Sequence, residues 1–112
     1  MIEVINIKSN YPPADVAVFD MGVAINDAKR KGVKALIVVH GYGSHGMGGL
    51  IKKMAVDYLS TARKKGEITL FVKGENWSDL NPDKIKACEI CPELILNSQL
   101  NNMNSGVSVI IL

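Results

Sequence analysis

The sequence predicts an α/β fold, a two-layer sandwich in which a four-stranded mixed sheet carries two main helices on one face. Three observations predict it. Short apolar stretches alternate with longer stretches of helical periodicity, the length of 112 residues suits one domain, and 47% of the residues are apolar, which is typical of globular chains. We therefore expect a single domain over residues 1–112, with the order βαβα-β-(α)-β and a helical segment inserted at about 74–106.

Four stretches rich in branched apolar residues are expected to be strands. They are Ile2 to Ile7, Ala35 to Val39, Glu67 to Lys73 and Val107 to Leu112. The second is a continuous apolar run, which favours a parallel strand that is covered on at least one side and flanked by neighbouring strands. We expect the first strand to lie beside the second and the second beside the third, all running in one direction.

Two long stretches are expected to be helices. From Ala14 to Lys31 apolar residues recur at three- and four-residue spacing, and Gly32 follows as a stop signal. A second stripe runs from about Gly49 to Lys65 and ends at Gly66. Because nearly all strand–helix–strand crossovers are right-handed, both helices should cover the same face of the sheet.

The 33 residues from Gly74 to Gly106 are too many for a bare loop in so small a domain. Asn81 followed by Pro82 is a typical helix start, and this helix should run to about Ile90. Trp77 is expected to anchor the segment on the core. The polar, asparagine-rich stretch 97–105 is expected to be mobile.

Charge and hydropathy exclude some classes of protein. No apolar run approaches the roughly 20 residues that span a bilayer, and the first residues lack the pattern of a signal peptide, so we expect a cytoplasmic protein without a membrane partner. Residues 1–66 carry ten Lys or Arg against five Asp or Glu, whereas residues 67–112 carry three against six. This asymmetry is compatible with one basic face, although basic clusters at 29–31 and 63–65 also suit helix C-termini.

A glycine-rich loop runs from His40 to Gly49 and holds five glycines in ten residues. It follows a strand and precedes a helix, so it should lie at the sheet edge where ligands of α/β proteins gather. Free backbone N–H groups and the positive end of the helix dipole bind phosphate oxygens at such positions. The candidate phosphate-binding residues are Gly41, Tyr42, Gly43, Ser44, His45, Gly46, Gly48, Gly49, Lys52 and Lys53.

Gly41, Gly43 and Gly46 also match the dinucleotide pattern G-x-G-x-x-G. The match follows the second strand instead of the first, and no second mononucleotide-binding half follows. Glu75 lies too far along the chain to be the ribose-binding carboxylate expected about 20 residues on. The phosphate-binding pattern G-x-x-x-x-G-K-[ST] does not occur in the sequence. We expect no obligate small-molecule cofactor.

The stretch from Val38 to Gly43, the glycines before Leu50, and the closing run from Gly106 to Val109 resemble the small MutS-related (Smr) domain. That family has an apolar strand ending in H-G-x-G, then a basic helix, then a final G-x-T-x-V-like strand. The resemblance covers nearly the whole chain and implies one stand-alone Smr-like domain.

What the resemblance implies is a fold similar to the carboxyl-terminal domain of bacterial translation initiation factor three. It also implies binding of nucleic acid, RNA or DNA, often with the hydrolase activity of a nicking endonuclease or an endoribonuclease. The family's first motif is usually L-D-L-H-G or L-D-L-R-G, and the matching stretch here is degenerate: Asn6 stands at the acidic position. An amide is neither a general base nor an anionic metal ligand at neutral pH.

For a nuclease, the residues suggest a metal-independent route in which His40 moves a proton and Lys8 or Lys52 stabilises developing charge. No cofactor is expected, and magnesium only if the chain is a nuclease. His40 has an equal alternative as a structural residue that bonds the loop backbone. Tyr42 is either a stacking platform for an unpaired base or packed against its own helix.

Two other functions stay open. One is a small nucleotide-binding protein that uses the glycine-rich loop, and the other is a non-catalytic interaction module. Cys88 and Cys91 form an isolated C-x-x-C pair, which is weak evidence for zinc without a second pair. We expect reduced thiols, at least one of them buried.

Overall fold

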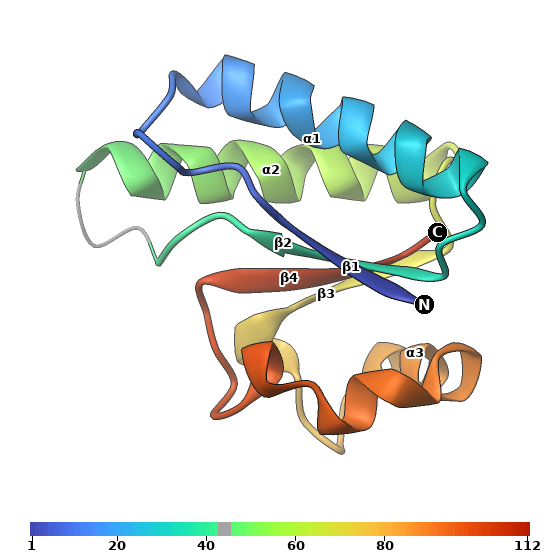
Figure 1. The fold of residues 1–112 in the computed structure, drawn as a ribbon. Coiled ribbons are helices and arrows are strands. Elements are labelled where there is room, and N and C mark those ends of the chain that lie inside the picture. The colour runs from blue at the N-terminus through green and yellow to red at the C-terminus, as the bar shows by residue number, and fades with distance from the viewer. Residues whose placement is uncertain (43–45) are drawn as a thin grey trace.

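The computed structural model describes residues 1–42 and 46–112 and confirms the predicted class, an α/β two-layer sandwich with a four-stranded mixed sheet. The strands are β1 (Ile2–Asn6), β2 (Ala35–Val39), β3 (Leu70–Lys73) and β4 (Val107–Ile111). Helices α1 (Ala14–Arg30) and α2 (Gly46–Lys64) lie side by side on one face of the sheet (Figure 1).

The strand order is β1-β2-β4-β3, which corrects one expectation. Strand β2 pairs in parallel with β1, but its other neighbour is β4, which is antiparallel to both β2 and β3. Strand β3 therefore runs in the same direction as β2, as expected, without lying beside it. The physical reason is that β4 is strongly apolar and is buried at every position, so it occupies a central place in the sheet.

One side of the sheet packs against α1 and α2. Alternate residues of the central strands, such as Leu36, Val38 and Ile110, join the buried faces of both helices in one apolar cluster. In α1 the buried residues are Ala17, Met21, Ile25 and Ala28, at the spacing that the sequence predicted. The two helices begin at the same end of the sheet, where β1 and β2 end (Figure 1).

The segment between β3 and β4 covers the other side of the sheet (Figure 1). It contains helix α3 (Pro82–Ile90) and three 3-10 helices, η1 (Gly74–Asn76), η2 (Pro92–Leu96) and η3 (Ser98–Leu100). Trp77, Leu94 and Leu100 pack with the strand residues that face this side. The expected anchoring role of Trp77 is confirmed, since only 7% of its surface is exposed.

Helix α3 begins as the sequence predicted. The side chain of Asn81 accepts hydrogen bonds from the backbone N–H groups of Asp83 and Lys84, and Pro82 occupies the first helical position. Arg63 near the end of α2 makes two hydrogen bonds of 2.8 and 3.0 Å to the Asp83 carboxylate. This pair connects the helical face of the sheet to the start of α3.

Three features differ clearly from the sequence expectations. Helix α2 begins at Gly46, three positions earlier than expected, so Gly46 and Gly48 belong to the helix instead of the loop. Strand β3 begins at Leu70, because the chain from Gly66 to Thr69 is still turning after the helix. Residues 98–100, expected to be mobile, form η3, since buried Leu100 fixes them to the core.

Both cysteines are free, and Cys91 is buried, as expected. None of the helices in the described part of the chain is long and apolar enough to cross a membrane.

Candidate nucleic-acid interface

The candidate site lies at the edge of the sheet where β1, β2 and β3 end and where β4 and α2 begin, and we call this edge the rim (Figure 1). Of the candidate residues, Gly43, Ser44 and His45 lie outside the described residues, and Gly46 and Gly48 lie in the first turn of α2. The other candidates are Lys8, His40, Gly41, Tyr42, Gly49, Lys52 and Lys53. The structure brings all of them to the rim or to the first turns of α2.

His40 is fully buried immediately after β2. Its Nδ1 lies 2.9 Å from the carbonyl oxygen of Gly41, and its Nε2 lies 2.8 Å from Oγ of Ser108 in β4. Since a carbonyl only accepts, Nδ1 carries the proton and Nε2 accepts from the Ser108 hydroxyl. Both ring nitrogens are thus engaged inside the protein.

The environment of His40 favours the neutral ring. Burial lowers the pKa of His40 below its ordinary value, and the positive charge of Lys52 acts in the same direction. The hydrogen bond to Gly41 opposes these effects without reversing them. A neutral, buried imidazole whose two nitrogens are occupied fits the structural alternative for this residue better than proton transfer to a substrate.

Gly41 is the point at which the chain leaves the sheet. Its φ of +86° is a left-handed conformation that favours glycine, and an added Cβ would lie 3.0 Å from Cδ of Lys8. Its N–H donates to the carbonyl of Gly106, as does the N–H of His40. The backbone amide of Gly41 is therefore used within the fold and is not free to bind a phosphate, contrary to the expectation for this residue.

Lys8 follows β1, and its side chain lies across Gly41. The backbone N–H of Lys8 donates to Oδ1 of Asn6 at 2.9 Å. Asn6, which stands where the Smr pattern has an acidic residue, thus caps the turn after the first strand. Its amide has a structural use here that does not require a negative charge.

Lys52 is largely buried and is held by the loop before β4. Its Nζ donates to Oε2 of Glu75 at 2.8 Å and to the carbonyl oxygen of Ser105 at 3.0 Å. Burial alone would raise the pKa of the Glu75 carboxyl, but the hydrogen bond and charge of Lys52 outweigh it, so that pKa lies below its usual value. Lys52 therefore links α2 to Glu75 and to the loop before β4. Its positive charge is mostly paired within the protein.

Tyr42 projects from the rim with 64% of its surface exposed. Its ring lies against Gly106: a Cβ built on that glycine would be 3.2 Å from Cε1 and Cζ of the ring. The hydrogen bond from the Gly106 N–H to Oδ1 of Asn104, 2.9 Å long, fixes the backbone on which the ring rests. The ring is thus supported from one side and open to solvent over most of its surface.

A shallow depression of about 360 Å³ lies next to Tyr42. Its lining residues are Tyr42, Gly49, Lys52, Lys53, Val56, Asp57 and Lys73. Lys53 is exposed and makes a 3.1 Å ion pair with Asp57 one turn further along α2. The depression therefore combines three lysines with one aromatic ring at the beginning of a helix.

Sequence reasoning missed Lys73 in this site. It is the last residue of β3 and reads from the sequence as a polar position of an alternating strand. Only the strand order places the end of β3 next to α2. The signal that could have found it is its position at the carboxyl end of a strand parallel to β2.

Within residues 1–42 and 46–112, no group of three or more His, Cys, Asp or Glu side chains is arranged to hold a metal ion. Comparisons of the chain with protein-family models, with curated proteins and with solved structures found no match. The resemblance to the Smr family and to the initiation factor domain therefore stays a prediction from the sequence. The function has to be argued from the rim itself.

Proposed function

We propose that this protein binds nucleic acid at the rim, holding the phosphate backbone with lysines and stacking an unpaired base on Tyr42. The observation that carries the proposal is the solvent-exposed Tyr42 ring, supported by Gly106, beside a depression lined by Lys52, Lys53 and Lys73. Aromatic side chains next to cationic grooves are the usual means of binding single strands without strict sequence preference. The sequence resemblance to the Smr family supports the same class of partner.

The lysines of the depression differ in how available their charges are to bind a phosphate. Lys53 pairs with Asp57 on the surface, where ion pairs are weak and a phosphate can compete for the cation. Lys73 lies half-buried at the end of β3. Lys52 is committed to Glu75 and contributes mainly by holding the rim in shape. We therefore assign backbone binding to Lys53 and Lys73.

The function proposed for the rim is binding of nucleic acid without cleavage, and His40 has a structural role. Its imidazole is buried and bonded at both nitrogens, so it reaches no substrate in this arrangement. Incubating labelled RNA and DNA with the protein, with and without magnesium, tests whether cleavage accompanies binding.

The substitution Tyr42→Ala is expected to weaken binding of a labelled single-stranded oligonucleotide by about 5- to 150-fold, since stacking contributes about 1–3 kcal/mol per base. Binding of duplex of the same length should change much less, because its bases are already stacked. Fluorescence anisotropy with RNA and DNA oligonucleotides measures both. Thermal unfolding of the variant should match the wild type, because the ring is mostly exposed.

The double substitution Lys53→Gln and Lys73→Gln is expected to weaken binding and to flatten its salt dependence. For single strands the slope of log K against log salt should fall by about 0.7 for each phosphate contact removed. The matched control removes the same charge elsewhere, at exposed Lys34 and Lys86, and should leave the slope unchanged. Binding that ignores salt, or equal effects of both double variants, would rule out the rim as the interface.

A further inference from the structure

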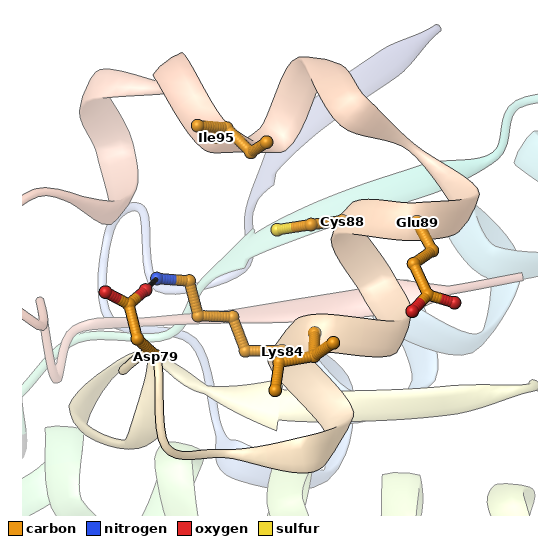
Figure 2. Close-up of a pocket in the computed structure, with 6 residues that line it drawn as sticks. Asp79, Lys84, Cys88, Glu89 and Ile95 are labelled. Carbon is orange, nitrogen blue, oxygen red and sulfur yellow. Dashed lines mark hydrogen bonds and ion pairs between the residues drawn. The ribbon is translucent and has the colours of Figure 1, made fainter.

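A second cavity lies on the opposite face of the sheet from α1 and α2, between α3 and η2 (Figure 2). Its volume is about 430 Å³, and it is lined by Asp79, Lys84, Ile85, Cys88, Glu89 and Ile95. None of these residues belongs to the rim. The cavity is therefore a separate candidate for ligand binding.

The floor and walls of the cavity are largely apolar. Ile85 and Cys88 come from α3, and Ile95 lies across the space from Cys88 on η2 (Figure 2). Ile85 is 50% exposed and Ile95 is 64% exposed, which leaves two large aliphatic side chains facing the solvent-filled space. Apolar surface gathered in a hollow is typical of a binding site, whereas scattered exposed residues are not.

One cation is held at the edge of this apolar surface. The Lys84 side chain is 18% exposed, and its Nζ lies 5.4 Å from the centroid of the Trp77 ring. The same nitrogen lies 2.8 Å from Oδ1 of Asp79, whose side chain is 96% exposed (Figure 2). Packing on Trp77 fixes the cation, whereas its anionic partner stands in water and forms only a weak pair.

We propose that this cavity binds a small amphipathic carboxylate, such as a medium-chain fatty acid. The ligand's carboxylate takes the place of Asp79 at Lys84, and its apolar chain lies against Ile85, Cys88 and Ile95. Lys84 provides the cation that pairs with the head group, and the aliphatic side chains of the lining contact the tail. The volume falls in the range of small-molecule pockets, about 300–1,000 Å³, and a stable protein partner would need about 800 Å² of surface on each side.

Octanoate is the probe, and octan-1-ol of equal chain length is its uncharged control. Titration of the full chain by calorimetry or by NMR should show saturable binding of octanoate and weaker binding of the alcohol. Hexanoate should bind less tightly than octanoate, by up to about fourfold for each methylene removed. No saturation with octanoate at millimolar concentration overturns the proposal.

Two variants have opposite expected effects. Asp79→Asn removes the competing carboxylate, so octanoate affinity should rise about two- to fivefold while octan-1-ol affinity stays the same. Lys84→Met keeps an apolar stem against Trp77 but removes the cation, so octanoate affinity should fall about 10- to 100-fold. A fall in affinity for Asp79→Asn, or no change in either variant, contradicts the assigned head-group site.

The tail site is tested by Ile95→Ser, which should weaken octanoate and octan-1-ol alike. The matched control is Leu80→Ser, because Leu80 is 92% exposed but does not line the cavity. Equal effects of the two substitutions would contradict the placement of the chain against Ile95.

The wild-type protein offers a further test that requires no substitution. Cys88 lines the cavity and is partly exposed, whereas Cys91 is fully buried and serves as the internal control. Octanoate should slow alkylation of Cys88 by iodoacetamide at fixed pH, and octylamine should not. Unprotected Cys88 at saturating octanoate, or dimerisation through this face without octanoate binding, overturns the proposal.

Discussion

Replacing Gly74 with alanine is expected to lower the free energy of unfolding by about 3 kcal/mol or more, which is at the upper end of overpacking effects. Gly74 follows β3 directly and is buried against the loop that leads into β4. A Cβ at this position would lie 1.7 Å from the carbonyl oxygen of Asn104 and 2.8 Å from that of Val107. Both are backbone atoms, so no side-chain rotation relieves the collision.

The relaxation available to this variant is movement of the loop before β4. That loop carries the Ser105 carbonyl that accepts from Lys52 and the Gly106 carbonyl that accepts from His40 and Gly41. Moving it disturbs three hydrogen bonds at the rim as well as the start of the central strand. The expected loss of free energy of unfolding is therefore larger than for alanine in place of a glycine on the surface.

Urea denaturation of the wild type and of Gly74→Ala gives the comparison, and Gly66→Ala is the matched control. Gly66 has a φ of +76°, and a Cβ added there would meet nothing within 4 Å, so alanine costs only backbone strain, about 1–2 kcal/mol. If Gly74→Ala were no more destabilising than Gly66→Ala, the close backbone approach at Gly74 would be disproved.

The parts of the fold that the sequence predicted are those with local signals. Helix α1 follows from apolar spacing and a glycine stop, and α3 follows from the Asn81 and Pro82 start signal. The place of β4 between β2 and β3 has no local signal, because strand pairing depends on contacts far apart in the chain. Val39 and Val107 pair across 68 positions, and nothing near either residue specifies the partner.

In the candidate site too, the sequence predicted the features with local signals and missed those that depend on distant contacts. The sequence placed His40, Tyr42 and the start of α2 at one edge because each follows or precedes a recognisable element. It could not show that Lys52 is paired with Glu75, since that contact depends on where the segment after β3 folds back. Nor could the burial of His40 be foreseen, because its partner Ser108 lies 68 residues away in the sequence.

Replacing His40 with alanine is expected to lower the free energy of unfolding by about 3–5 kcal/mol, combining a cavity with the loss of two internal hydrogen bonds. Ser108 would then be left buried without its acceptor. Ser108→Ala alone should cost about 1–2 kcal/mol. A double-mutant cycle should give a clear coupling energy between the two residues, and strict additivity would contradict the hydrogen bond between them.

The same arrangement predicts how stability changes with pH. Burial holds the pKa of His40 below its ordinary value of about 6.5. Just below that pH, the His40 ring is therefore protonated in the unfolded chain and still neutral in the folded chain. The stability that depends on the neutral His40 ring is fully present above about pH 6.5. It is lost as the pH falls from about 6.5 through the lower pKa of the folded state. There the free energy of unfolding should drop by up to about 1.4 kcal/mol per pH unit.

Urea denaturation between pH 8 and pH 5 measures this slope, and His40→Gln should show a flatter one because the other titrating groups are unchanged. An NMR titration of the His40 ring in the wild-type protein provides the same answer where the variant is too unstable. The ring signal should stay that of neutral imidazole below pH 6.5. A protonation midpoint above 6.5 would mean that His40 gains a proton on folding, and its assignment as a buried neutral link between β2 and β4 would then be wrong.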